Sequence, residues 1–162
     1  ITHSKFDNLI EATYKMEDIS TMERLYRWVA GFEMVSDRPW SGFGPNNFYV
    51  NYNKYTISAF QTYVSDNPDH SGIHNYYLMT AVDQGIFGLL IFVMMIAMVL
   101  IIGQRVYHRL TNSKDKIVLA SSLCSFIVIL SLNLINDIIE VDKVGPFFFF
   151  SMAVVAFYNY IK

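Results

Sequence analysis

Apolar positions are spread differently over the two halves of the chain. The second half holds three uninterrupted apolar runs without Asp, Glu, Lys or Arg, at residues 86–103, 117–135 and 145–161. A membrane-spanning helix needs roughly 20 mostly apolar residues, with about 17 as the short limit. Three such runs in close succession, separated by short polar loops, favour transmembrane helices over buried core helices. The pattern therefore predicts three spans after a more polar first half.

The first half mixes polar and apolar residues and predicts helices outside the lipid. Ser20 followed by Glu23 is a capping-box pattern. Pro39 disfavours helical backbone at the residue before it, so this first helix is expected to end near Ser36. A second helix is expected from about His74 into the first span. The apolar stripe of the first helix, at helical spacing, consists of Met22, Leu25, Val29 and Phe32.

Charged residues are scarce and unevenly placed. Only 16% of residues are charged, against about 25% in a typical soluble protein. The loop at residues 104–116 has four basic residues and one acid, whereas the loop at 136–144 has three acids and one base. The positive-inside rule then places loop 104–116 in the cytoplasm and residues 1–85 in the periplasm. A chain that starts at Ile1 with an exported segment is expected to be the C-terminal part of a longer protein.

Composition also excludes some functions. A net charge of −2 gives no basic surface for nucleic acid. Cys124 is the single cysteine and lies in an apolar run, so no disulfide framework is expected. His70 and His74 lie near Asp66 and Asp69, but Pro68 and Gly72 interrupt any shared helix, and no metal site is expected.

Candidate chemistry is concentrated in the polar half. His74 precedes the helix that enters the membrane, and histidine can accept a proton near pH 7. A locally hydrogen-bonded structural histidine is the alternative. Arg24 and Arg27 share a helix face and suit a pyrophosphate, because arginine binds phosphate bidentately. Arg27 has Glu23 as a ready i, i+4 partner, so Arg24 is the better ligand candidate.

Four short motifs follow one another within residues 20–90. Their order resembles the conserved domain of the O-antigen ligase and polymerase superfamily, and the later spans fit the C-terminal topology of that family. Asp83 departs from the pattern, since glutamate is expected there. The motifs are Glu23-Arg24-Leu25-Tyr26-Arg27-Trp28, Pro39-Trp40-Ser41-Gly42-Phe43-Gly44-Pro45-Asn46-Asn47, His74-Asn75 and Gly85-Ile86-Phe87-Gly88.

The resemblance implies an all-α integral membrane protein of the bacterial inner membrane. The chain would be the C-terminal part of a multi-spanning GT-C-type glycosyltransferase, inactive alone, with residues 1–85 as a helical periplasmic catalytic loop. The enzyme would be inverting and metal-independent and need no soluble cofactor. Its donor would be a glycan on undecaprenyl pyrophosphate, supplied within membrane lipid. Its acceptor would be lipid A-core or a growing glycan.

The same resemblance assigns roles to individual residues. His74 would be the general base, and Arg24 would stabilise the departing pyrophosphate. The residues expected to contact substrate are Arg27, Asn75, Gly42, Gly44 and Asn47. Asn75 would orient the His74 ring, and the two glycines would let backbone amides approach the glycan or phosphate.

Two other functions fit the same residues. A repeat-unit polymerase would use the same donor with a different acceptor. A non-catalytic glycan-binding or transport segment would keep the loop and make no bond. Substitution of the histidine and arginines would then change binding or flux without abolishing bond formation.

Overall fold

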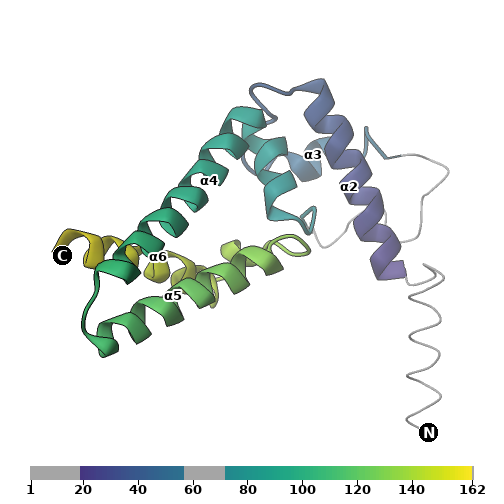
Figure 1. The fold of residues 1–162 in the computed structure, drawn as a ribbon. Helices are drawn as coiled ribbons and strands as arrows, with labels where there is room; N and C mark the ends of the chain where they lie inside the picture. The colour runs from purple at the N-terminus through teal and green to yellow at the C-terminus, as the bar shows by residue number, and fades with distance from the viewer. Residues whose placement is uncertain (1–18, 57–71, 162) are drawn as a thin grey trace, which may run out of the picture.

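The computed structural model describes residues 19–56 and 72–161, and every regular element within these ranges is helical. Figure 1 shows their arrangement. In chain order they are α2 (Ile19–Asp37), α3 (Phe48–Tyr52), α4 (Tyr76–Arg109), α5 (Ser113–Leu132), the 3-10 turn η2 (Ile138–Glu140) and α6 (Gly145–Ile161).

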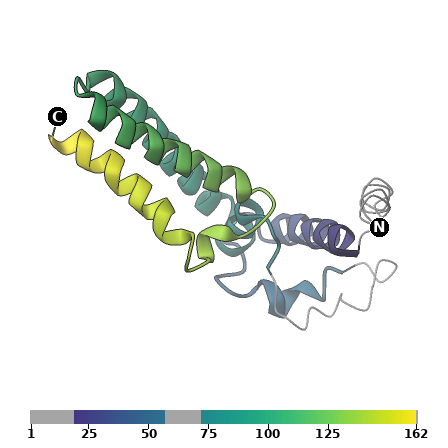
Figure 2. The same cartoon turned by 90° about the horizontal axis from the view of Figure 1, so that it is seen from below.

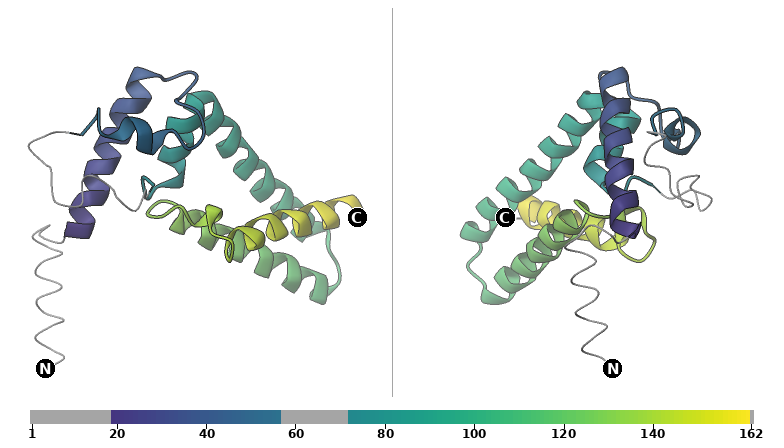
Figure 3. Two further views of the ribbon diagram at one scale, coloured as in Figure 1. Left: turned by 180° about the vertical axis from the view of Figure 1, so that it is seen from behind. Right: turned by 90° about the vertical axis from the view of Figure 1, so that its right-hand side faces the viewer.

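The molecule has two ends of different character. Helices α2 and α3 lie at one end, beside the loop that joins α5 to α6 (Figures 1 and 2). The α4–α5 connection and the end of α6 lie at the opposite end, as the two views in Figure 3 also show. The acidic loop and the polar helices therefore share one end, and the basic α4–α5 region occupies the other.

Helices α4, α5 and α6 pack through apolar side chains but leave much of their apolar surface uncovered. The rings of Phe126 and Phe148 stack at 4.9 Å between α5 and α6. Outward-facing Ile91 and Met98 on α4 are more than half exposed. Both α4 and α5 are long and apolar enough to cross a membrane, and α6 is a shorter apolar helix. Such large exposed apolar surfaces are typical of contact with lipid or further helices.

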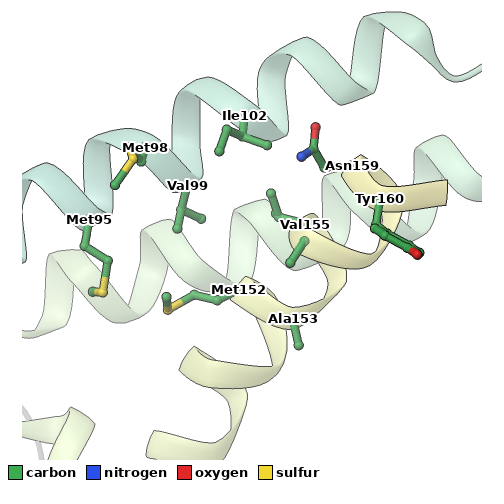
Figure 4. Close-up of a pocket in the computed structure, with 10 residues that line it drawn as sticks. Met95, Met98, Val99, Ile102, Met152, Ala153, Val155, Asn159 and Tyr160 are labelled. Atoms are coloured by element: carbon green, nitrogen blue, oxygen red, sulfur yellow. The ribbon is translucent and has the colours of Figure 1, made fainter. Parts of the chain in front are cut away.

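A groove of about 820 Å³ runs between α4 and α6. Figure 4 shows its walls, which are almost wholly apolar apart from Asn159 and the Tyr160 hydroxyl. The groove therefore lies between a helix long enough to cross a membrane and a shorter apolar helix. The labelled lining residues include Met95, Met98, Val99, Ile102, Met152 and Val155.

Helix α4 is broken at Gly85, where φ is 71° and ψ is −174°. The two arms of the helix form a V at this point (Figure 1). The rings of Tyr76 on the first arm and Phe92 on the second meet across the V at 5.3 Å. The break lies directly before the first predicted span, so the long apolar arm begins where the uninterrupted apolar sequence begins.

Helix bounds differ from the sequence expectation mainly at the loops. Helix α4 continues to Arg109 and α5 begins at Ser113, so only three residues connect them, instead of the predicted loop at 104–116. Charged residues at a helix end in water do not oppose helical backbone. Asn112 caps α5 by accepting the Lys114 N–H at 3.0 Å. Helix α5 ends at Leu132, three residues before the predicted end.

Candidate functional site

His74 lies in a short segment, residues 72–74, that is held from two sides. From α2, Trp28 Nε1 donates a hydrogen bond to the Ile73 carbonyl at 3.0 Å, and Arg27 Nη1 donates to the Gly72 carbonyl at 3.2 Å. From the α5–α6 loop, the Asp137 carboxylate accepts the His74 backbone N–H at 3.0 Å. Two distant parts of the sequence, α2 and the α5–α6 loop, therefore fix this segment.

The backbone of His74 is left-handed, with φ of 58°, a conformation that costs energy for a residue with a side chain. Such backbones are found where surrounding contacts hold them and often at functional sites. The hydrogen bonds to the segment on either side of His74 supply that restraint. The strained backbone aims the ring into the space between α2 and the α5–α6 loop.

The His74 ring contacts Arg27 directly. Arg27 Nη1 lies 3.2 Å from His74 Nε2. A guanidinium can only donate, so Nε2 must be the nitrogen with the lone pair and the imidazole must be neutral. Burial and then the charge of Arg27 lower the pKa of His74, with a smaller contribution from Arg24 in the same direction. Asp137 and a hydrogen bond with the Asn136 side chain act the other way.

Arg27 is the more buried of the two arginines, with only 6% of its surface exposed. Its guanidinium lies at the 4.0 Å limit of an ion pair with Glu23, which is itself 6% exposed. Arg27 also hydrogen-bonds the Tyr52 side chain. The expected Glu23 pairing is therefore present, but the sequence did not reveal that Arg27 also reaches His74.

Arg24 is partly exposed. Within the described ranges no hydrogen bond or ion pair involves its guanidinium. Its charge is nevertheless near enough to lower the pKa of His74. A positive group close to the base and without a protein partner in the described ranges is suited to an anionic ligand.

Asn133 joins the elements around His74. It is fully buried, its Nδ2 donates to the Ile129 carbonyl at 2.9 Å, and its Oδ1 accepts the Ile139 N–H at 3.3 Å. Its own carbonyl accepts the Tyr76 N–H at 2.9 Å. One residue at the end of α5 thus ties the start of α4 to the α5–α6 loop that carries Asp137.

Asp137 acts on the backbone beside the base. Its carboxylate accepts the backbone N–H groups of both His74 and Asn75. Burial raises the pKa of Asp137, and these two amides oppose that rise. Its second oxygen, Oδ1, is buried and has no hydrogen-bond partner in the described structure. The sequence placed Asp137 in the acidic loop at 136–144 but gave no connection with His74.

Asn75 has a structural role at the start of α4. Its Oδ1 accepts the Leu78 N–H at 3.0 Å and caps the first arm of α4. Within the described residues no hydrogen bond joins the Asn75 side chain to the His74 ring, so the role expected of Asn75 in orienting that ring stays a prediction. The ring contacts Arg27 and Asn136 instead.

The glycine turn, residues 39–44, docks onto the break in α4. Gly42 has φ of 64°, and a Cβ there would meet the Asp83 carbonyl carbon at 2.5 Å. The Gly42 N–H donates to the Arg38 carbonyl at 3.1 Å. Three further bonds join turn and break: Phe43 N to Val82 O at 2.8 Å, Gly44 N to Asp83 O at 2.9 Å, and Ile86 N to Pro39 O at 2.7 Å.

These bonds correct the expected role of the turn. The amides at Gly42 and Gly44 are already used inside the protein, so they are not free to bind glycan or phosphate. Gly42 is needed because backbone of α4 lies where a side chain would be, and Gly44 because its φ of 89° is in the left-handed region. Asn47, exposed beside the turn, donates from Nδ2 to the Phe43 carbonyl at 2.9 Å.

The described ranges contain no group of three or more His, Cys, Asp or Glu side chains positioned for a metal ion. His70, Asp66 and Asp69, which the sequence analysis weighed as metal ligands, lie outside the described residues.

Comparison with known proteins identifies a family. The model of the O-antigen ligase family matches residues 1–93, more than half of the chain and all of the elements around His74 except the α5–α6 loop. No curated protein and no solved structure matches the chain.

Proposed function

Because the chain belongs to the O-antigen ligase family, we propose that it is part of a membrane glycosyltransferase that moves a glycan from undecaprenyl pyrophosphate to an acceptor hydroxyl. The family and the apolar helices indicate a membrane protein with a ligase or polymerase role. The acceptor in this proposal is lipid A-core, which makes the reaction a ligation. His74 and Arg24 carry the chemistry.

The observation that carries the proposal is a neutral histidine beside two arginines. The contact with Arg27 requires an unprotonated Nε2, and the lowered pKa of His74 keeps the ring neutral near pH 7. A base must be unprotonated to accept a proton, and it must lie near the group that it deprotonates. Two guanidinium groups beside it suit the negative charge of a pyrophosphate.

The proposed step is a single inverting displacement. The acceptor hydroxyl attacks the anomeric carbon, and its proton passes to His74 Nε2. The bond between the anomeric carbon and the phosphate oxygen breaks, and its electron pair leaves with undecaprenyl pyrophosphate. Arg24 stabilises the charge that develops on that oxygen, as preorganised positive groups do in phosphate chemistry. The proton on His74 then returns to solvent.

The architecture supports a periplasmic location for this site. Helix α2, the His74 segment and the acidic α5–α6 loop lie at one end of the molecule, and the basic α4–α5 region lies at the other (Figure 2). Basic residues are retained on the cytoplasmic side of bacterial membrane proteins. In this orientation the site faces the periplasm of the inner membrane, at the surface where a lipid-linked donor presents its pyrophosphate.

The test is glycan transfer by the full-length protein, reconstituted with lipid-linked donor and lipid A-core acceptor. His74→Ala is expected to reduce transfer by about 10²–10⁴-fold, the usual contribution of general base catalysis. Arg24→Ala is expected to cost about 10²–10³-fold, as loss of one charge-stabilising group does. Normal transfer by either variant at wild-type expression would refute the role of that residue.

Matched controls exist at the other end of the same protein. His108 and Arg109 are exposed in the last turn of α4, far from the His74 segment along the helix. His108→Ala and Arg109→Ala remove the same two side-chain types and are expected to keep normal transfer. The surface polysaccharide of a strain that carries the His74 variant distinguishes a ligase from a polymerase. A ligase defect removes all glycan from lipid A-core, whereas a polymerase defect leaves single repeat units.

A further inference from the structure

In the structure described, the contact between Arg27 and His74 occupies the nitrogen that the proposed base needs for accepting a proton. Nε2 of a neutral imidazole has one lone pair, and it points at Arg27 Nη1 at 3.2 Å. An acceptor hydroxyl needs that lone pair. The base and its arginine neighbour are therefore in a closed arrangement, in which Nε2 is already occupied.

Arg27 is well held in this arrangement. Nη1 also donates to the Gly72 carbonyl at 3.2 Å, Glu23 lies at ion-pair distance, and the Tyr52 side chain hydrogen-bonds the guanidinium. None of these partners is a phosphate, and only Glu23 is charged. A pyrophosphate offers several charged oxygens, which bind a guanidinium more strongly than neutral carbonyl or hydroxyl groups do.

We propose that Arg27 caps the base in the resting enzyme and that the pyrophosphate of the donor draws Arg27 away, so that His74 becomes available only when donor is bound. This inference rests on the proposed function, because it assumes His74 as the base. Arg27 is then a positioning residue that sets the tautomer of His74, separate from Arg24, which would remain on the pyrophosphate throughout the step.

Other groups around His74 do not replace this cap. On α2, Arg24 affects His74 only through its charge. On the α5–α6 loop, Asp137 accepts the backbone N–H of His74 and not a ring hydrogen, and the Asn136 hydrogen bond raises the pKa of the ring, as an acceptor would. Among these neighbours, Arg27 alone is shown to donate to Nε2.

The first measurement needs no transfer activity. The full-length protein is labelled with ¹⁵N-histidine, and the His74 signal is assigned by its loss in His74→Gln. The wild type is expected to show a neutral ring with an unprotonated, hydrogen-bonded Nε2. Arg27→Gln is expected to change the Nε2 shift and to move the titration of His74 to higher pH, because the charge that disfavours protonation is lost. Arg24→Gln, the matched control, is expected to leave the Nε2 hydrogen bond unchanged.

The second measurement adds undecaprenyl pyrophosphate to the wild-type protein. The Nε2 signal is expected to move toward that of Arg27→Gln, whereas the same addition to Arg27→Gln produces little further change. If undecaprenyl pyrophosphate leaves the Nε2 signal of the wild type unchanged, the proposal that the donor draws Arg27 away from His74 is wrong. This arm uses no substitution, so it decides the question even if Arg27→Gln does not fold.

Transfer kinetics separate this inference from the proposed function. If the protein transfers glycan, kcat/KM for the donor, which reports the free enzyme, is expected to fall at acid pH in Arg27→Gln while the wild-type value persists, because Arg27 still lowers the His74 pKa before donor binds. Arg27→Lys is expected to keep more of the acid activity. An acid limb that is identical in all three proteins contradicts the role of Arg27. If no protein transfers glycan, the proposed function fails, while the ¹⁵N spectra still report whether Arg27 caps His74.

Discussion

Replacing Gly85 with alanine tests the break in α4, on which the position of the site depends. The backbone at Gly85 has φ of 71° and ψ of −174°, a combination that only glycine adopts readily. A Cβ at this position would lie 2.3 Å from the Trp40 carbonyl oxygen. The glycine turn cannot stay in place against that contact, so the substitution must separate the turn from the break.

The cost can be built from two parts. Alanine in this backbone region costs on the order of 1–3 kcal/mol. The three hydrogen bonds between turn and break, at 2.7–2.9 Å, contribute about 1 kcal/mol each and are lost or lengthened when the turn moves. Gly85→Ala is therefore expected to destabilise the folded protein by about 4–6 kcal/mol.

The assay is thermal unfolding of the full-length protein in detergent. The quantity measured is the fraction of protein that remains monodisperse in size-exclusion chromatography after heating. A loss of this size is expected to lower the Tm by on the order of 10 °C. Gly31→Ala is the control, because Gly31 lies inside α2 and its added Cβ would meet only side-chain atoms, those of Leu78 at 3.0 Å and of Ile73 at 3.2 Å. Alanine also favours helix by about 1 kcal/mol over glycine, so the control Tm should hardly change.

The result that would refute the reasoning is a Gly85→Ala protein that melts with the wild type. The break in α4 would then tolerate a side chain, and the glycine turn could not be packed rigidly against it. Equal losses in Gly85→Ala and Gly31→Ala would also refute it, because the effect would then come from any added methyl group rather than from the backbone conformation.

Two further substitutions address how His74 is held. Trp28→Phe removes the 3.0 Å hydrogen bond to the Ile73 carbonyl while keeping an aromatic ring. It is expected to cost about 1 kcal/mol of stability and to lower the transfer rate more than it changes the KM. Unchanged transfer would mean that this bond does not position the base. Asn133→Leu leaves the Ile139 N–H without its acceptor in a buried site. It is expected to cost about 2–4 kcal/mol of stability, measured as a loss of Tm. A wild-type Tm would show that the buried asparagine is dispensable.

Part of this site is accessible from local sequence. The O-antigen ligase resemblance rested on short motifs whose order is visible without coordinates, and the family match confirms it. The helix over α2 followed from its apolar spacing, and His74, Arg24 and Arg27 were singled out by their chemistry. These three residues lie near one another in the structure, which is consistent with those choices. Their roles in transfer remain predictions.

Other parts were incomplete or misread because residue type does not fix every partner. Arg27 was paired with Glu23, and the structure has that pair at 4.0 Å, but the sequence did not show that Arg27 also contacts His74, 47 residues away. Gly42 and Gly44 indicated a close approach of backbone, which was right, but the approaching group is the broken helix α4 instead of a ligand.

The sequence by itself determined the helical class, the three apolar helices and the family, because each depends on periodicity, run length or motif order along a continuous stretch. The tertiary structure alone decided which groups meet at His74. Asp137 comes within 3.0 Å of the His74 amide only because α5 and its loop return to the end of the molecule where α2 lies. Such a meeting depends on chain reversals at a glycine break and a buried asparagine, and no local pattern encodes their combined geometry.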